Sequence, residues 1–157
     1  MPAFSGLFPH QVRLPSGLKV KKMDLPSEHC VLIVDDDPSI RLLLVTFLRH
    51  KGYQVLEAQN GREALTAMCA GHPDLVVMDL VMPEVSGWDV LRERAADPLL
   101  LRIPMIVISA SNTRKVTADV LDKRVYAVIA KPFDLDTLLT AVENCLEDPS
   151  GLAVEAA

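Results

Sequence analysis

Short runs of apolar residues alternate with longer segments of helical periodicity along most of the chain. The short runs are almost continuously apolar, as expected for strands that helices cover on both faces of a sheet. Strands that alternate with helices are typical of βα units, and five such units fit the pattern. The sequence therefore predicts one α/β domain with an open, five-stranded parallel sheet. The strands are expected at Cys30–Val34, Tyr53–Glu57, Leu75–Met78, Met105–Ile108 and Ala127–Ala130.

The segment after the first expected strand has the clearest helical pattern. Asp37 is suited to cap its start, Pro38 suits its first turn and Gly52 stands just past its end. Its apolar residues follow the spacing of a helix with one buried face. They are Ile40, Leu43, Leu44, Phe47 and Leu48.

Four further helices are expected. Asn60 and Glu63 have capping-box spacing at the start of the second helix, and the third helix follows Gly87. The fourth helix, near residues 112–122, has only weak apolar patterning. The fifth follows Asp134 and has its apolar residues on one side. These are Leu135, Leu138, Leu139, Val142 and Leu146.

Length and composition agree with one globular domain. The chain has 157 residues, half of them apolar, and a net charge of -5. No segment reaches the ~20 apolar residues that span a bilayer, and no secretory signal is evident, so a cytoplasmic location is expected. The three cysteines form no CxxC pair, which argues against a disulfide framework and a zinc site. We expect Cys30, Cys69 and Cys145 to be small buried apolar residues.

Positive charge is concentrated at the N-terminus. Residues 1–23 contain four basic residues and no acidic residue, and proline and glycine interrupt any regular pattern there. We interpret residues 1–27 as a mobile basic extension, residues 28–148 as the folded domain and residues 149–157 as a short tail. The extension fits a solvated segment, an organelle transit peptide or a contact with an anionic surface, and the sequence leaves these open.

Acidic residues follow two of the expected strands. Asp35, Asp36 and Asp37 come directly after the first strand, and Asp79 comes directly after the third. Open parallel sheets bind ligands at the carboxyl ends of their strands, so these acids are expected to meet there. A Mg²⁺ ion would relieve their mutual repulsion. The alternative is that Asp37 only caps the helix, which we favour for this residue, and that Asp35 and Asp36 are solvated turn acids.

A hydroxyl and an ammonium group follow two other strands. Ser109 stands directly at the end of the fourth expected strand and Lys131 directly at the end of the fifth, one residue past each, so both should reach the same edge as the acids. Each alone fits an ordinary turn residue or a solvated charge. Together with carboxylates and Mg²⁺, they are what handling of a phosphoryl group at a carboxylate nucleophile requires.

Four segments of the sequence resemble the motif blocks of the response-regulator receiver domain of two-component signalling. They are VLIVDDDPSIR, PDLVVMDLVMPEVSG, IPMIVISAS and AKPFDLDTLL, in that order between residues 30 and 146. The spacing also resembles that family, with 43 residues from Asp36 to Asp79, 30 from Asp79 to Ser109 and 22 from Ser109 to Lys131. The resemblance implies a flavodoxin-like, doubly wound sheet of five parallel strands in the order 2-1-3-4-5, with five helices.

The resemblance also implies roles for the acidic residues. Asp79 would be the phosphoacceptor, receiving a phosphoryl group from the phosphohistidine of a partner kinase. Asp36, Asp79 and the backbone carbonyl of Val81 would bind Mg²⁺, and Asp35 would bind it directly or through water.

Further roles follow from the same resemblance. Lys131 would pair with the phosphoryl oxygens, and the Ser109 hydroxyl would move to bond one of them after transfer. A cis peptide bond between Lys131 and Pro132 would aim the lysine. Pro83 and Gly87 would shape the loop after the acceptor, which is compatible with ordinary turn punctuation.

The chain departs from the family pattern at two places. Val128 stands three residues before the lysine, where the family often has an aromatic switch residue. Tyr126 is expected on the same strand face as Val128 but at another location, so it is no substitute. Val81 and Ser111 stand two residues beyond the acceptor and the hydroxyl, at positions that tune dephosphorylation in this family. Because an apolar Val81 cannot hold an attacking water, we expect slow self-dephosphorylation.

These observations favour a stand-alone phosphorelay response regulator that is not an enzyme beyond its own phosphorylation and dephosphorylation. Its partners would be a sensor histidine kinase or histidine phosphotransfer protein and a downstream effector protein, with phosphorylation switching an interaction surface. A receiver that docks partners without phosphorylation is an alternative. An aspartyl-nucleophile phosphohydrolase is another, although Val81 stands where such enzymes carry a second acid.

Direct contact with nucleic acid or membrane is not expected. The chain is acidic overall and has no helix-turn-helix pattern. The basic residues of its fourth helix region fit either a solvated helix face or a docking surface for an acidic partner. They are Arg114, Lys115, Lys123 and Arg124.

Overall fold

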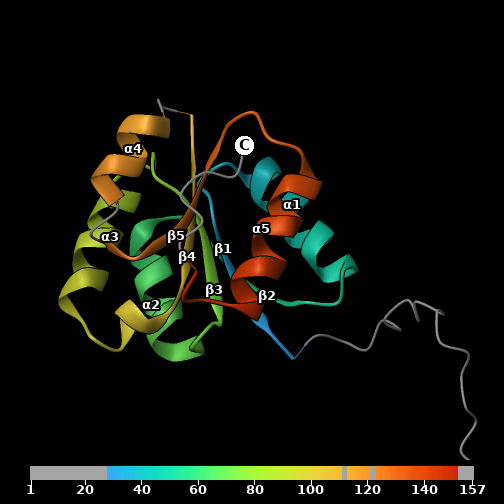
Figure 1. Ribbon diagram of the computed structural model, residues 1–157, viewed down its shortest axis with the longest axis horizontal. Coiled ribbons are helices and arrows are strands. Elements are labelled where there is room, and N and C mark those ends of the chain that lie inside the picture. Colours follow the sequence, from blue (N-terminus) through green and yellow to red (C-terminus); the bar gives the residue numbers. More distant parts are fainter. Residues whose placement is uncertain (1–27, 111–112, 121–122, 152–157) are drawn as a thin grey trace, which may run out of the picture.

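The computed structural model describes residues 28–110, 113–120 and 123–151 (Figure 1). The expected basic extension, residues 1–27, and Ser111 lie outside the described residues, as do residues 152–157 of the expected tail. No helix in the described ranges is long and apolar enough to cross a bilayer.

Five parallel strands form one sheet in the order β2-β1-β3-β4-β5. The predicted α/β fold and strand order are therefore confirmed. The neighbours β1 and β3 mark the point where the strand order reverses, and in such sheets the ligand crevice lies outside the carboxyl ends of the strands at this point. The strands are β1 (Cys30–Val34), β2 (Gln54–Ala58), β3 (Leu75–Asp79), β4 (Met105–Ser109) and β5 (Val125–Ala130).

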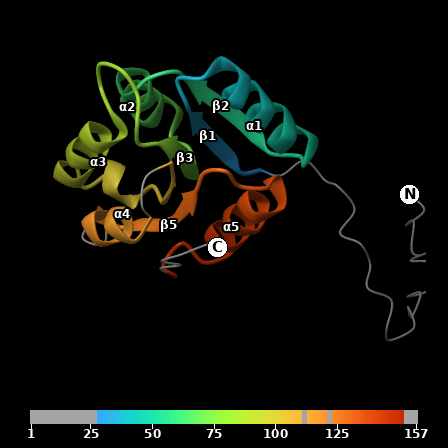
Figure 2. The ribbon, with the colours of Figure 1, turned by 90° about the horizontal axis from the view of Figure 1, so that it is seen from above.

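Helices cover both faces of the sheet (Figures 1 and 2). α1 and α5 pack on one face, and α2, α3 and α4 on the other. A short 3-10 helix, η1, precedes β4. The helices are α1 (Pro38–His50), α2 (Gly61–Gly71), α3 (Gly87–Ala96), η1 (Leu100–Arg102), α4 (Thr113–Val120) and α5 (Leu135–Glu147).

Side-chain caps fix the helix starts. The Asp37 carboxylate accepts hydrogen bonds from the backbone N–H groups of Ser39 and Ile40, which confirms the predicted cap of α1. Asn60 caps α2, but Glu63 accepts from the Gln59 backbone rather than from Asn60, so the expected capping box is only half formed.

Two further caps place the start of α3 and α5. Ser86 and Asp89 form a complete capping box at α3 that the sequence reading did not identify. Asp134 accepts from Thr137 N–H at the start of α5, as its position suggested. A cap of this kind contributes about 1 kcal/mol to helix stability.

The buried stripe of α1 differs from the expected one. Leu44, Val45 and Leu48 are buried, whereas Leu43 is 53% exposed. The expectation for Leu43 was wrong because the inward face of the helix is rotated toward Val45, where α1 meets the sheet. The stripe of α5 is shifted in the same way, with the small residues Ala141 and Cys145 buried beside Leu138 and Val142.

The prediction for the cysteines was correct for only one of them. Cys145 is buried in α5, and burial raises the pKa of its thiol to about 12. Cys30 is half-buried at the first position of β1, and Cys69 is exposed on α2. Met68, the neighbour of Cys69 on α2, is fully buried, so the next residue turns outward.

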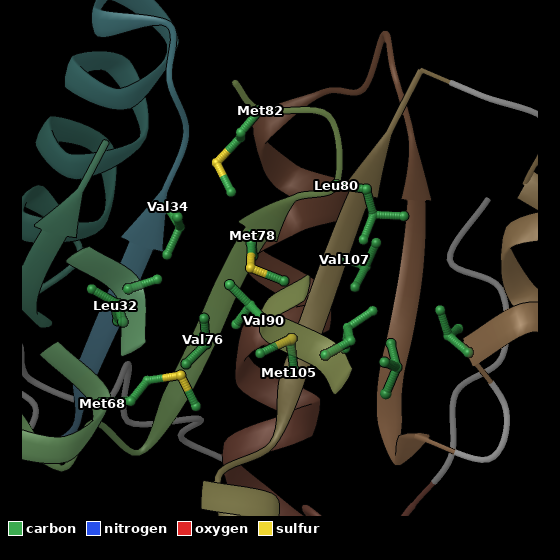
Figure 3. Close-up of a cluster of buried hydrophobic side chains, with 14 of the residues drawn as sticks. Leu32, Val34, Met68, Val76, Met78, Leu80, Met82, Val90, Met105 and Val107 are labelled. Carbon is green, nitrogen blue, oxygen red and sulfur yellow. The ribbon is translucent and has the colours of Figure 1, made fainter. Parts of the chain in front are cut away.

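The core beneath α2, α3 and α4 is rich in methionine (Figure 3). Met68, Met78, Met82 and Met105 are buried there, and Trp88 packs against this cluster while half-buried. Because these apolar side chains fill the sheet face up to its carboxyl edge, the polar residues collect at that edge.

Candidate functional site

Three carboxylates meet at the carboxyl edge of the sheet. Asp35 and Asp36 follow β1, and Asp79 is the last residue of β3. The parallel register pairs Val34 with Met78, so the next residue of each strand, Asp35 and Asp79, reaches the same level. Carboxylate oxygens of Asp35, Asp36 and Asp79 all lie within 4.8 Å of one another.

The three acids differ in their exposure and hydrogen bonding. Asp35 is 2% exposed and its Oδ1 accepts from the Asp37 backbone N–H at 2.9 Å, whereas Asp36 is exposed. Asp79 is 7% exposed and its Oδ1 accepts from the Val81 backbone N–H at 2.9 Å. These backbone donors orient the two buried carboxylates.

Burial raises the pKa of the Asp35 carboxyl above its ordinary value. The negative charges of Asp79 and Asp36 raise it further, while the Asp37 N–H and the Lys131 ammonium act in the opposite direction without cancelling the shift. Loss of a proton at Asp35 therefore adds unfavourable charge to an already acidic cluster.

Lys131 supplies positive charge to this cluster. Its Nζ lies 2.6 Å from Oδ2 of Asp79 and 3.5 Å from Oδ2 of Asp35. Burial alone would lower the pKa of the ammonium group, but its contacts with Asp79 and Asp35 outweigh that effect and raise the pKa. The Lys131–Pro132 peptide bond is cis, as the resemblance implied.

Ser109 reaches the same edge from β4. It is the last residue of that strand, is 1% exposed and is aligned with Ala130 of β5. The Lys131 backbone N–H donates to the Ser109 carbonyl at 2.9 Å. The structure thus brings Asp35, Asp36, Asp79, Ser109 and Lys131 to one edge of the sheet, as the sequence predicted.

The loop after Asp79 is shaped by close backbone packing. A Cβ atom at Gly87 would lie 2.6 Å from the carbonyl oxygen of Asp79, so only glycine fits this approach. The Gly87 N–H also donates to the Leu80 carbonyl at 3.0 Å. Val81 is 64% exposed, and its apolar side chain has no hydrogen-bonding group to offer the acids.

Tyr126 and Val128 lie on opposite faces of the sheet, which corrects the expectation that they share one face. Val128 packs in the core under α2, α3 and α4, and Tyr126 packs in the core under α1 and α5. The cause is an irregularity in β4–β5 pairing, where Met105 aligns with Val125 but Ile106 aligns with Ala127. Tyr126 is the extra residue and breaks the alternation of the strand.

Residues 31–143 match the model of the family described as the response regulator receiver domain. The chain belongs to this family.

Relatives of this receiver domain include short and long proteins. Protein PilH of Pseudomonas aeruginosa is 35% identical over 118 residues, which make up 74% of this chain and 96% of PilH. The DNA-binding transcriptional regulator NtrC of Rhizobium meliloti is 37% identical over 120 residues, 76% of this chain but 24% of NtrC. The chain spans about a quarter of the length of NtrC and of the regulatory protein AtoC of Escherichia coli.

A solved receiver structure shares the fold. The response regulator TrrA from Thermotoga maritima, solved in complex with Mg²⁺-BeF, is 31% identical, with a TM-score of 0.65 over 74% of this chain and 97% of that one. The donor set of the present receiver fits Mg²⁺ because its three clustered carboxylates are hard oxygen ligands. Burial is the largest cause of the raised pKa of Asp35, and the negative charges of Asp79 and Asp36 add to it.

Arg41 of the receiver is a further residue at the site that the sequence reading missed. Its Nη1 donates to the main-chain carbonyl of Asp35 at 2.8 Å, and its Nε lies 3.7 Å from Oε2 of Glu57. Arg41 thereby holds the peptide between Asp35 and Asp36. Its position one helical turn after the helix cap Asp37 is the sequence signal that was available.

The basic residues around α4 lie mainly on the surface of the receiver. Arg114, Lys115 and Arg124 are exposed, and Lys123 is half-buried with its ammonium group donating to the Asp119 carbonyl. This distribution fits the solvated helix face weighed above, and a docking role stays a prediction.

Proposed function

We propose that the chain is a phosphorelay response regulator that accepts a phosphoryl group on Asp79 from a phosphohistidine. The observation that carries this proposal is the setting of the Asp79 carboxylate at the carboxyl edge of the sheet. It lies beside two further acids and 2.6 Å from the Lys131 ammonium group. A carboxylate nucleophile needs nearby positive charge to approach an anionic phosphoryl group.

The transfer exchanges one bond for another. A carboxylate oxygen of Asp79 attacks phosphorus, the P–N bond to the donor histidine breaks, and an acyl phosphate forms on Asp79. Lys131 neutralises charge on the phosphoryl oxygens, and the hydroxyl of Ser109 donates a hydrogen bond to one of them. Mg²⁺ bound by Asp35, Asp36, Asp79 and the Val81 carbonyl would supply further charge neutralisation.

Phosphorylation would change a protein-interaction surface. Ser109 ends β4 and Lys131 directly follows β5, and these two strands lie beneath α4 and α5. A shift of either residue toward the phosphoryl group would therefore alter the surface on that side of the domain. Val128 is small, buried and apolar, so the change on this surface does not depend on rotation of an aromatic ring at that position.

The donor would be a sensor histidine kinase or a histidine phosphotransfer protein, and an effector protein would read the phosphorylated form. The exposed side chains of Leu42 and Leu43 on α1, the helix that begins next to Asp36 and Asp37, offer an apolar contact for the donor. Because kinase histidines receive their phosphoryl group from ATP, this chemistry belongs in the cytoplasm.

The phosphohydrolase alternative finds less support at the site. Such an enzyme needs a second acid beside the nucleophile to protonate a leaving group. Val81 holds that place, and its side chain is apolar and exposed. We therefore propose signalling without turnover of small substrates. The phosphate-independent docking module keeps the same fold and is separated from our proposal by experiment.

The test is incubation of the purified chain with Mg²⁺ and acetyl phosphate, followed by measurement of intact mass. We expect the wild type to gain one phosphoryl group, and the Asp79→Asn variant and the wild type in EDTA to gain none. Asp37→Asn is the matched control, since Asp37 caps α1 and lies outside the carboxylate cluster. Equal labelling of wild type and Asp79→Asn would contradict the proposal. No labelling, together with no Mg²⁺ binding, would favour the docking module.

A further inference from the structure

Arg94 on α3 is fully buried and has no part in the proposed chemistry. Its guanidinium group donates to the main-chain carbonyls of Leu101, Ile103, Lys123 and Arg124, at distances that include 2.7 Å to Ile103 and 3.1 Å to Arg124. Burial, with a smaller contribution from the charge of Arg124, lowers the pKa of Arg94 to about 10. Burying a charged group is costly, so this arrangement calls for an explanation.

The carbonyls that Arg94 binds stand just before two neighbouring strands. Ile103 precedes β4 and Arg124 precedes β5, and one nitrogen, Nη2, donates to both. Arg94 therefore joins the amino ends of the two strands whose carboxyl ends carry Ser109 and Lys131. The hydrogen bond from Arg94 to the Lys123 carbonyl joins α3 to the turn before β5. The helices α3 and α4 lie side by side on this face of the sheet (Figure 2).

The turn held by Arg94 has an unfavourable backbone. Arg124 has φ 50, in the left-handed region that side chains other than glycine and asparagine seldom adopt. The bulge at Tyr126 follows two residues later, between the pairs Met105–Val125 and Ile106–Ala127. Two hydrogen bonds from Arg94 to the carbonyls of Lys123 and Arg124 stabilise this strained turn directly before the bulge.

The bulge decides which residues of β5 reach the site. Beyond it the pairing is regular as far as Ser109 and Ala130, and the Lys131 N–H then donates to the Ser109 carbonyl. Without the extra residue, β5 would slip by one position against β4. A slip of one residue turns every side chain to the other face, and it would move Lys131 relative to Ser109 and Asp79.

We propose that Arg94 is a positioning residue for the site: by holding Arg124 in its left-handed turn, it sets the bulged register that places Lys131 beside Ser109 and Asp79. The consequence for phosphoryl transfer rests on the proposed function, whereas the consequence for register does not. Arg94 thus acts through Arg124 and the β4–β5 pairing, at the end of the sheet opposite the acids.

The first test compares Arg94→Leu with Val45→Ala. Val45 is buried on the other face of the sheet, so its truncation destabilises the domain without touching the Arg94 contacts. We expect Arg94→Leu to slow labelling by acetyl phosphate about tenfold, since small misplacements of reacting groups cost this much or more. The amide NMR signals of Ser109 and Lys131 should shift in Arg94→Leu and stay at their wild-type positions in Val45→Ala.

The second test is rescue through Arg124. Glycine adopts a positive φ without strain, so Arg124→Gly added to Arg94→Leu should bring the labelling rate and both amide signals back toward wild type. A purely structural role for Arg94 predicts no such rescue. If Arg94→Leu does not fold, Arg94→Lys replaces it in both tests, alone and combined with Arg124→Gly. This variant keeps a positive charge but has only one donor group.

Each outcome decides the proposal. Wild-type amide signals for Ser109 and Lys131 in a folded Arg94→Leu variant, or a lack of rescue by Arg124→Gly, would overturn it. If the wild type itself accepts no phosphoryl group, the proposed function fails, but the amide signals of Ser109 and Lys131 still show whether Arg94 sets the register.

Discussion

The ammonium group of Lys131 lies 2.6 Å from Oδ2 of Asp79, across 52 residues of sequence. It also lies 3.5 Å from Oδ2 of Asp35, so one cation faces two buried carboxylates. Mg²⁺ and a phosphoryl group would both alter this arrangement, because Mg²⁺ competes with the ammonium for Asp79 and a phosphoryl group draws the ammonium toward its oxygens. The contact is therefore both a source of stability and a part of the proposed switch.

Replacing Lys131 with methionine removes that cation. We expect the metal-free variant to lose about 1–3 kcal/mol of unfolding free energy, less than for a fully buried pair because Lys131 keeps some contact with water. We also expect Mg²⁺ to stabilise the variant more than the wild type, since no ammonium competes for Asp79. Urea unfolding in EDTA and in Mg²⁺ measures both effects. Lys115→Met, an exposed lysine on α4, is the control, and an equal loss in that variant would refute the explanation.

Asp35→Asn tests the raised pKa of the Asp35 carboxyl. A group whose pKa is higher in the folded state binds protons more tightly there, so its contribution to stability is present in acid and is lost as pH rises. In the wild type this loss begins above the ordinary value of 3.8 and is complete once the pH exceeds the raised pKa. The free energy of unfolding of Asp35→Asn in EDTA should therefore increase relative to wild type across this window.

Urea unfolding at a series of pH values from about 3 to 8 gives the comparison. Asp119→Asn, an exposed acid on α4, serves as the control for removal of one negative charge. A difference between Asp35→Asn and wild type that does not change with pH would contradict the assigned cause. Added Mg²⁺ should reverse the sign of the difference, because the metal uses the charge that is unfavourable in its absence.

Much of this site could be predicted from the sequence because its residues stand at ends of strongly patterned elements. Asp35, Asp79, Ser109 and Lys131 each end or follow an apolar strand, and parallel strands present their carboxyl ends on one edge. The cap at Asp37 was equally local, because it depends only on Ser39 and Ile40, two and three residues further along the chain.

The features that could not be predicted depend on contacts between distant segments. The exposure of Leu43 follows from how α1 is rotated on the sheet, and the role of Arg94 follows from carbonyls up to 30 residues away. Tyr126 could not be placed on the correct face because alternation along a strand fails at a bulge, and this bulge involves the pairing partner Met105. Single-strand periodicity holds no information about that pairing.

Val81→Asn should shorten the lifetime of the phosphorylated form. The wild-type side chain is apolar and 64% exposed, so it cannot hold an attacking water by hydrogen bonding, and the acyl phosphate should persist for much longer than seconds. An amide at this position could hold such a water, and we expect about a tenfold faster loss of the phosphoryl group. This is less than the roughly 100-fold or more that a positioned acid–base group contributes, because an amide orients the water without taking its proton. Intact mass, followed over time in Mg²⁺ after removal of acetyl phosphate, measures the rate.

Val81→Ile is the matched control, because it keeps an apolar, β-branched side chain at the same position. Its phosphoryl group should be lost at the wild-type rate. A wild-type half-life of only seconds, or equal rates in Val81→Asn and Val81→Ile, would show that another group directs the water.

Leu42 and Leu43 provide a test of donor docking that is separate from the chemistry. They are 66% and 53% exposed on α1, close in sequence to Asp36 and Asp37, so a donor that brings its histidine to Asp79 would cover them. Replacing both with serine should change the unfolding free energy by less than about 1 kcal/mol, because exposed side chains contribute little to stability. Labelling by acetyl phosphate, which needs no docking surface, should stay at the wild-type rate.

Transfer from a kinase should respond differently. The experiment uses a panel of purified sensor kinases from the same organism and selects the kinase that labels the wild type fastest. This kinase should label the double variant about tenfold more slowly than the wild type, as expected when an apolar contact is removed from an interface. Leu99→Ser is the control, since Leu99 is 73% exposed but precedes η1, near the amino end of β4 and away from the acids. Equal slowing by Leu99→Ser would indicate that a serine at any exposed leucine position slows the transfer, without contact between α1 and the donor. Unchanged transfer to the double variant would place the donor contact elsewhere, because a docked donor at α1 cannot leave these two leucines in water.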